Sequence, residues 1–130
     1  MIGLDTNVII RYLTQDDPGQ AKKASSLIEN RLNVKEPGFI TLIVLVELVW
    51  VLESCYSQGK EEILNVLQGL LTTRQLVVEK ADMAYLAMKH YTSATADFSD
   101  ALIMVISERE GCSKVMTFDK NARSVGMDLL

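Results

Sequence analysis

The chain has 130 residues, 48% of them hydrophobic, and a net charge of −4 at pH 7. This length is typical of one domain, and the hydrophobic share excludes an intrinsically disordered chain. The negative charge argues against a basic nucleic-acid-binding module, but acidic residues that hold a cation are compatible with a nucleic-acid substrate.

The N-terminal segment is expected to be a buried strand that turns directly into a helix. Met1–Leu4 is largely apolar and ends at Asp5, which suits a strand with an acid at its carboxyl end. Asp5, Thr6 and Asn7 are residue types that cap helices, and the sequence then continues apolar through Val8–Leu13. The first helix therefore begins where the first strand ends.

A second helix and a second strand follow. Asp17 fits the N-cap and Pro18 the first helical position, and apolar residues recur at helical spacing over Gln20–Leu32. Pro37-Gly38 ends this helix, and Phe39–Thr41 is expected to be a short strand.

The most apolar stretch, Leu42–Leu52, contains one polar residue, Glu47. A helix that is apolar on all sides is expected inside the domain, which would place the Glu47 carboxylate in a dry environment. A buried carboxylate stays ionised only beside a positive group. That group is either an arginine, with Arg11 as the obvious candidate, or a metal ion.

The rest of the chain alternates between helices and strands. Its patterns predict helices over Glu61–Leu71, Lys80–Tyr91 and Asp97–Glu108, strands over Gln75–Val78 and Lys114–Phe118, and no firm assignment for Asn121–Leu130. Short strands that alternate with helices indicate an α/β fold, in which a parallel sheet of four or five strands is flanked by helices.

Cysteine usage and the N-terminus indicate a cytoplasmic protein. Cys55 and Cys112 lie far apart without a CxxC spacing, which favours reduced thiols. The start MIGLD is not a signal peptide, and no apolar run approaches the about 20 residues that a membrane span needs. The single histidine, His90, lies in a polar helical stretch and is expected at the surface.

Acidic residues fall where ligands bind in this class of fold. Asp5 and Asp119 end strands, and ligands of parallel sheets bind beyond the carboxyl ends of strands. Glu47 is alone in its apolar helix, and Asp97 and Asp100 share a helix face. Oxygen ligands without a histidine cluster select Mg²⁺ or Mn²⁺. Such ions hold the attacking and leaving oxygens of a phosphodiester, so metal-dependent phosphodiester hydrolysis is the chemistry that this set predicts.

Each acid also has a structural interpretation that the sequence leaves open. Asp5 and Asp97 are suited to cap helices, and Asp119 is suited to a turn. Glu47 is suited to an ion pair with Arg11.

Four motifs, LDTNVIIRYLTQDDPGQA, VLVELVWVL, ADFSDALI and MTFDK, are spread over nearly the whole chain. In this order and spacing they resemble a PIN-domain ribonuclease, and within that family a VapC-type toxin of a type II toxin–antitoxin system. The resemblance implies one PIN domain over residues 1–130 and an endoribonuclease that depends on Mg²⁺ or Mn²⁺.

The resemblance also assigns roles to the acids. Asp5, Glu47, Asp100 and Asp119 match the family's catalytic and metal-binding quartet, and Asp97 matches a further acid beside the third position. In the implied mechanism, water activated by the metal attacks the phosphorus in line, and the metal stabilises the leaving 3′ oxygen.

Neighbouring residues and partners follow from the same resemblance. Supporting roles, in which side chains hold carboxylates or waters in place, fall to Thr6, Asn7 and Thr117. Contacts to RNA phosphates are expected from Arg11, Lys120 and Arg123. A cognate antitoxin and a homodimer are implied as partners, and the apolar residues leave room for a surface patch that would bind one.

Other functions remain to be weighed. A phosphatase of the dehalogenase type needs an aspartate two positions after the first, where this chain has Asn7, and the acid pattern of a receiver domain is also missing. A non-catalytic PIN-like module that binds RNA or protein is disfavoured by the intact quartet. A DNA nuclease remains open, and the sequence does not identify the RNA, its cleavage site, the antitoxin or the number of metal ions.

Overall fold

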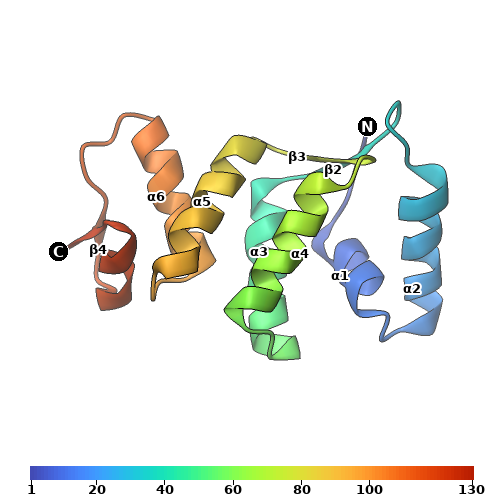
Figure 1. Ribbon diagram of the computed structural model, residues 1–130, viewed down its shortest axis with the longest axis horizontal. Helices are drawn as coiled ribbons and strands as arrows, with labels where there is room; N and C mark the ends of the chain where they lie inside the picture. Colours follow the sequence, from blue (N-terminus) through green and yellow to red (C-terminus); the bar gives the residue numbers. More distant parts are fainter. The chain divides into compact units, whose positions relative to one another are not determined.

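The computed structural model describes residues 1–130, which divide into two units (Figure 1). The first unit is Met1–Glu79 and the second is Lys80–Leu130. No helix in either unit combines the length and the apolar composition that crossing a membrane requires.

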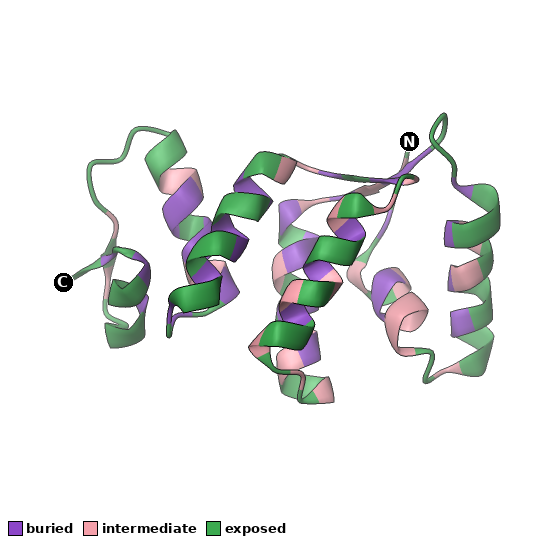
Figure 2. Cartoon of the chain, viewed as in Figure 1, coloured by how far each residue is buried: buried purple, intermediate pink, exposed green.

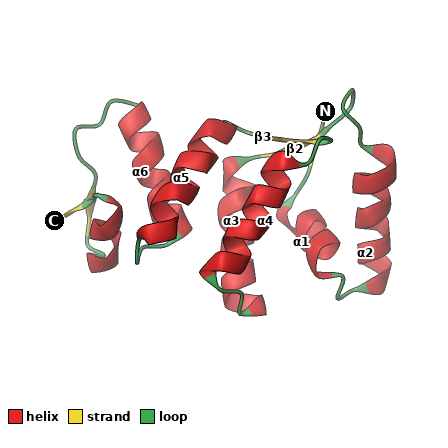
Figure 3. Cartoon of the chain, viewed as in Figure 1, coloured by secondary structure: helices red, strands yellow, loops and turns green.

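The first unit is a three-stranded parallel sheet with helices, and the helices make up most of it (Figure 3). Its strand order is β1-β2-β3. In the sheet Ile2 pairs with Gly38, which in turn pairs with Leu76. In chain order its elements are β1 (Ile2–Gly3), α1 (Thr6–Thr14), α2 (Pro18–Ser25), a π-helical turn η1 (Ser26–Arg31), β2 (Gly38–Ile40), α3 (Leu42–Tyr56), α4 (Lys60–Thr72) and β3 (Leu76–Val78).

The second unit is built on a pair of helices and a two-stranded parallel sheet. Its elements are α5 (Ala81–Ser93), α6 (Phe98–Arg109), β4 (Met116–Thr117), a 3₁₀-helix η2 (Lys120–Val125) and β5 (Asp128–Leu129). The helices α5 and α6 pack together, and the rings of Tyr91 and Phe98 meet edge to face with centroids 5.8 Å apart. β4 pairs with β5 through Met116 and Asp128.

The predicted α/β class is confirmed, and all strand pairs are parallel. Each predicted helix and strand is present within a few residues of its expected bounds, with one difference: the helix expected over Gln20–Leu32 is α2 as far as Ser25 and then the π-helical turn η1. The five strands pair as one three-stranded and one two-stranded sheet, and β5 lies in the stretch that the sequence left unassigned. A single domain over residues 1–130 stays a prediction.

The predicted helix starts are confirmed by their capping hydrogen bonds. The Asp17 side chain accepts a hydrogen bond from the Gln20 amide at 3.0 Å, and Pro18 occupies the first helical position. Thr41 ends the extended segment of β2, and its hydroxyl accepts a hydrogen bond from the Val44 amide at 3.1 Å. The chain therefore passes from β2 into α3 without a loop.

Gly38 lies in the central strand because this position has no room for a side chain. A Cβ atom there would lie 2.8 Å from the Cδ1 atoms of Leu4 and Leu32, both of which are buried. This close approach brings the β1 end and the α2–η1 segment onto the middle of the sheet. The arrangement fixes where β1 ends and α1 begins.

The prediction that α3 is buried on all sides is wrong. Its core face is buried, as Figure 2 shows, and Leu45 and Leu48 have no exposed surface. Ile43, Glu47 and Trp50 recur at intervals of four and three residues and are exposed. Hydropathy cannot distinguish the two sides of this helix because apolar residues occupy both.

Candidate active site

In the first unit, Thr6 connects the two acids predicted to bind metal. Asp5 is the N-cap of α1, and its carboxylate accepts a hydrogen bond from the Thr6 amide at 2.8 Å. The Thr6 hydroxyl donates to Oε1 of Glu47 at 2.9 Å. One residue therefore holds both carboxylates through its backbone and its side chain.

The parallel sheet explains why these residues meet. β1 and β2 run in the same direction, so their carboxyl ends lie at the same edge of the sheet. Asp5 follows β1 after one residue, and α3 begins two residues after β2 ends. Glu47 lies in the second turn of α3, which contacts α1. The topology thus brings residues 41 positions apart in sequence to one place.

The expected dry environment of Glu47 is not found. Glu47 is exposed, and its hydrogen-bonding partner is Thr6 rather than Arg11. The Nε atom of Arg11 donates to Gln20 at 2.7 Å, and its NH1 atom forms an ion pair with Asp16 at 3.2 Å. The alternative in which Arg11 neutralises a buried Glu47 is therefore wrong.

In the second unit, the three predicted acids lie at element ends. Asp97 is the N-cap of α6, and its amide donates to Oδ2 of Asp100 at 3.3 Å. Asp119 follows β4 after one residue and caps η2, where its carboxylate accepts from the Asn121 amide at 2.9 Å. The capping roles that the sequence left open are present, and capping leaves carboxylate lone pairs free for a cation.

Among these three acids, Asp100 has a raised pKa. Partial burial raises its pKa above the ordinary value, and the nearby charges of Asp97 and Asp119 raise it further, against the lowering effect of the Asp97 amide. A carboxyl whose pKa is raised by burial and by neighbouring like charges is a common feature of functional sites. Asp97 and Asp119 are therefore both close enough to Asp100 for their charges to act on its carboxyl group.

The predicted neighbouring residues differ in what they contact. The Thr117 hydroxyl accepts a hydrogen bond from the Asp119 amide at 3.0 Å, so it shapes the turn that carries this acid. Lys120 and Arg123 are exposed on η2, where solvent-facing cations are free to bind phosphates. Asn7 is exposed on the first turn of α1. Outside these groups, His90 is exposed, as predicted, and both cysteines are free.

The donor atoms fit a hard cation. All of the predicted ligands are carboxylates, which suit Mg²⁺ and Mn²⁺. Within neither unit do three or more His, Cys, Asp or Glu side chains lie close enough together to hold a metal ion. The ligand set predicted from the sequence thus draws two carboxylates from the first unit and three from the second.

Comparison with known proteins identifies the family. Residues 2–127 match the PIN domain, so the match extends across both units. The chain belongs to the PIN domain family. This PIN domain is also similar to a VapC ribonuclease of Aquifex aeolicus (strain VF5), with 26% identity over 123 residues that cover 95% of this chain and 90% of the relative.

Sequence reasoning missed a group of polar residues in the α1–α2 part of the PIN domain. Nothing in the sequence singles out Asp16, Gln20 or Lys23 as binding residues. In the structure Asp16 forms an ion pair with Arg11, and Gln20 accepts a hydrogen bond from it. Gln20 and Lys23 line a pocket. The only sequence signal was the position of the Asp-Asp-Pro break, which returns α2 toward α1.

Replacing Thr6 by valine should lower RNA cleavage by about tenfold to a hundredfold, the usual effect of losing a group that orients a metal ligand. Valine keeps the shape of threonine but has no hydroxyl to donate to Glu47. The measurement is the cleavage rate over a range of Mg²⁺ concentrations, and the concentration for half-maximal rate should rise. Thr6→Ser keeps the hydroxyl and should restore both quantities.

A matched control is Thr72→Val. The Thr72 hydroxyl donates to the Gln68 carbonyl within α4, a helix that carries none of the predicted site residues, so this change should leave cleavage unaltered. Equal rates for Thr6→Val and Thr6→Ser would show that Glu47 does not depend on Thr6.

Proposed function

We propose that this PIN domain is a Mg²⁺-dependent endoribonuclease and the toxin of a toxin–antitoxin pair. The observation that carries the proposal is the contact of Thr6 with both Asp5 and Glu47, which holds two carboxylates at one edge of the sheet. Membership of the PIN family and similarity to a VapC ribonuclease support it.

In this proposal Asp5, Glu47, Asp97, Asp100 and Asp119 hold Mg²⁺ or Mn²⁺. The bound metal supplies an activated water for attack on phosphorus and neutralises charge on the leaving oxygen. The negative charges of these five carboxylates would attract a divalent cation, and the net charge of the chain, −4, adds to this attraction.

Other residues support binding rather than chemistry. Thr6 orients Glu47, and Thr117 fixes the turn before Asp119. Acidic residues repel RNA, so the contacts to its phosphates fall to cations outside the carboxylate set. We assign them to Lys120 and Arg123, which are exposed on η2, and to Arg11, discussed below.

The proposed partners are a cognate antitoxin and a second copy of the chain, in the cytoplasm. Ile43 and Trp50 are 72% and 65% exposed on the same face of α3 as Glu47. Large exposed apolar side chains that share a helix face suit a protein partner. A partner that covered this face would also cover Glu47, which is how an antitoxin would block the site.

The deciding experiment is RNA cleavage by the purified chain without any partner. Single-stranded and structured RNAs, with DNA of the same sequences, are incubated with Mg²⁺, with Mn²⁺ and with EDTA. Cleavage of RNA that needs the metal and stops in EDTA is the expected result. If only DNA is cleaved, the protein is a deoxyribonuclease and the ribonuclease proposal is wrong. No cleavage, together with no Mn²⁺ binding by calorimetry, would favour a non-catalytic binding module.

A further inference from the structure

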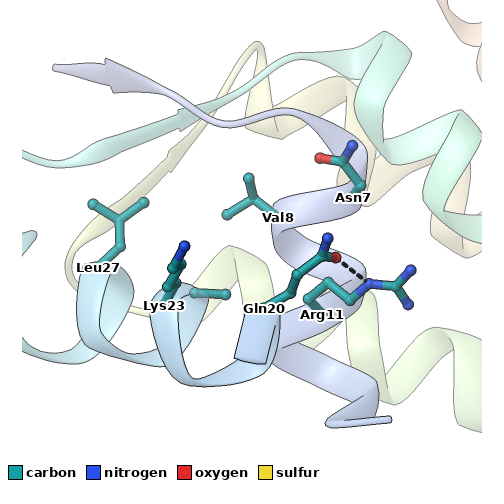
Figure 4. A pocket seen from close by; sticks show the side chains of 7 residues that line it. Asn7, Val8, Arg11, Gln20, Lys23 and Leu27 are labelled. Carbon is teal, nitrogen blue, oxygen red and sulfur yellow. Dashed lines mark hydrogen bonds between the residues drawn. The ribbon is translucent and has the colours of Figure 1, made fainter. Parts of the chain in front are cut away.

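The first unit contains a pocket of about 260 Å³ between α1 and α2, and the acids are not part of it. It is lined by Asn7, Val8, Arg11, Gln20, Lys23, Ala24 and Leu27. Figure 4 shows Asn7, Val8 and Arg11 on one side, and Gln20 and Lys23 on the other.

The pocket combines an apolar base with a polar rim. Val8, Ala24 and Leu27 supply apolar surface, while the remaining four lining residues are two amides and two cations. The lining contains no acid, although the chain has 17 of them. This distribution suits a ligand with a flat, hydrogen-bonding body and a negative charge.

Arg11 is fixed at the rim. Its Nε donates to Gln20 at 2.7 Å and its NH1 meets Asp16 at 3.2 Å. Asp16 also accepts hydrogen bonds from the hydroxyls of Tyr56 at 2.6 Å and Thr14 at 2.8 Å. A guanidinium held in this way loses little side-chain entropy when it binds a ligand.

Other polar groups at the rim are free to bind. The side-chain amide of Asn7 and the ammonium group of Lys23 form no hydrogen bond within the chain. The side-chain NH₂ group of Gln20 also donates to no residue. Asn7 and Lys23 are both exposed. The pocket therefore offers amide donors, an amide acceptor and a mobile cation.

We propose that the α1–α2 pocket binds one nucleotide of the RNA substrate, with the base against Val8 and Leu27 and a phosphate at Arg11 and Lys23. The inference rests on the proposed ribonuclease function and extends it by naming a subsite. Proteins recognise single-stranded RNA through unstacked bases, whose faces pack on side chains, mostly aromatic ones or arginine, and whose edges form hydrogen bonds. In this pocket Val8 and Leu27 would contact the face of the base, and the side-chain amides of Asn7 and Gln20 would bind its edge. The volume lies near the lower end of ligand pockets, about 300–1,000 Å³, and so suits one base rather than a longer ligand.

The position of the pocket agrees with this role. Asn7 is two residues after Asp5, and both belong to the start of α1. A base in the pocket would therefore lie beside a nucleotide whose phosphate is near Asp5. Since the pocket is on the same rigid helix as Asp5, it would set which base flanks the bond that is cut.

Binding is tested with the full-length chain in EDTA, so that cleavage is not needed. A fluorescent single-stranded RNA hexamer is titrated with wild type, Lys23→Ala and Lys22→Ala. Both lysines are exposed on α2 and each change removes one charge, but only Lys23 lines the pocket.

Lys23→Ala should weaken RNA binding about fivefold to tenfold. It should also lower the slope of the logarithm of the binding constant against the logarithm of salt concentration by about 0.7, as expected for one lost phosphate contact. Lys22→Ala should change binding less than about twofold. Equal effects of the two changes would overturn the assignment.

A second measurement separates the base from the phosphate. Methyl and amide NMR spectra of the chain are recorded with AMP, with UMP and with ribose 5-phosphate. The nucleotides should shift the methyl signals of Val8 and Leu27 and the Asn7 side-chain amide, while ribose 5-phosphate should leave the methyls unmoved. Methyl signals that ignore every nucleotide and the RNA hexamer would overturn the proposal and leave the pocket for a protein side chain.

The two proposals fail in different ways. Metal-dependent cleavage combined with equal binding by the Lys22 and Lys23 variants would reject the pocket and keep the ribonuclease. Nucleotide-induced shifts at Val8 and Leu27 without cleavage under any metal would reject the ribonuclease and keep a nucleotide-binding pocket.

Discussion

Asp5→Asn should reduce metal-dependent RNA cleavage by at least about a hundredfold and leave the free energy of unfolding nearly unchanged, because asparagine and aspartate are about equally good N-caps. Asparagine can still accept the hydrogen bond from the Thr6 amide, which Asp5 accepts at 2.8 Å. What the variant lacks is the negative charge that we propose binds the metal. The change therefore separates the capping role of Asp5 from its proposed metal-binding role.

The matched control is Asp17→Asn. Asp17 is the N-cap of α2 in the same unit and accepts its own capping hydrogen bond from Gln20, so the two changes remove the same charge from the same kind of position. Cleavage rates and urea unfolding are measured for both. Asp17→Asn should cleave as wild type does. A cleavage rate for Asp5→Asn equal to that of this control would remove Asp5 from the site.

Asp100→Asn should abolish cleavage and at the same time raise the melting temperature at neutral pH by about 1–3 °C. The pKa of Asp100 is raised in the folded chain by partial burial and by the charges of Asp97 and Asp119. Asparagine keeps an oxygen for the Asp97 amide and removes the charge that burial and its neighbours disfavour. The gain is small because water screens a half-buried group.

The pH dependence has a definite sign. The unfolded chain has the ordinary pKa of 3.8, and the folded chain has a higher one, so folded Asp100 holds its proton over an interval above 3.8. Stability of the wild type falls as the pH rises through that interval and is lower above it. The stabilising effect of Asp100→Asn should therefore be present at neutral pH and vanish at low pH. Wild-type cleavage should decline on acidification at a higher pH than an ordinary aspartate would cause.

Asp82→Asn is the control with the opposite pKa shift, because the pKa of Asp82 is lowered in the folded chain while that of Asp100 is raised. Arg109 donates to Asp82 at 3.0 Å, and this hydrogen bond is the main reason that the pKa of Asp82 is lowered. Removing this charge should leave the melting temperature unchanged or slightly lower, and cleavage intact. Thermal melts with and without Mg²⁺ complete the test, since the metal should stabilise the wild type but not Asp100→Asn. Shifts of the same sign for the two variants would contradict the electrostatic explanation.

Much of the local structure follows from neighbouring residues. Asp5 and Asp17 are expected as helix caps from their residue types, and the structure has both as N-caps. Thr41, expected at the end of a strand, is the N-cap of α3. The longer helices could be predicted from the spacing of apolar residues, which is also a property of one segment of the chain. The strand β5 was not predicted, because two residues carry no periodicity and the strand exists only through its pairing with β4.

The interpretation of Glu47 shows where such reasoning ends. An apolar run of eleven residues around one acid indicates burial, yet Glu47 lies on an exposed face of α3 beside Ile43 and Trp50. Which face of a helix meets the core depends on the elements packed against it. Hydropathy differs little between the two sides of α3, because Ile43 and Trp50 make the exposed side largely apolar as well.

By itself, the sequence determined the α/β class and the approximate positions of the longer helices, because these depend on residue type and on spacing along one segment. The tertiary structure alone decided three further features. Thr6 joins Glu47 to Asp5, Arg11 pairs with Asp16 rather than with Glu47, and α1 and α2 enclose a pocket. The Thr6–Glu47 contact depends on the parallel pairing of β1 with β2, whereas the Arg11–Asp16 pair and the pocket depend on how α2 folds back on α1.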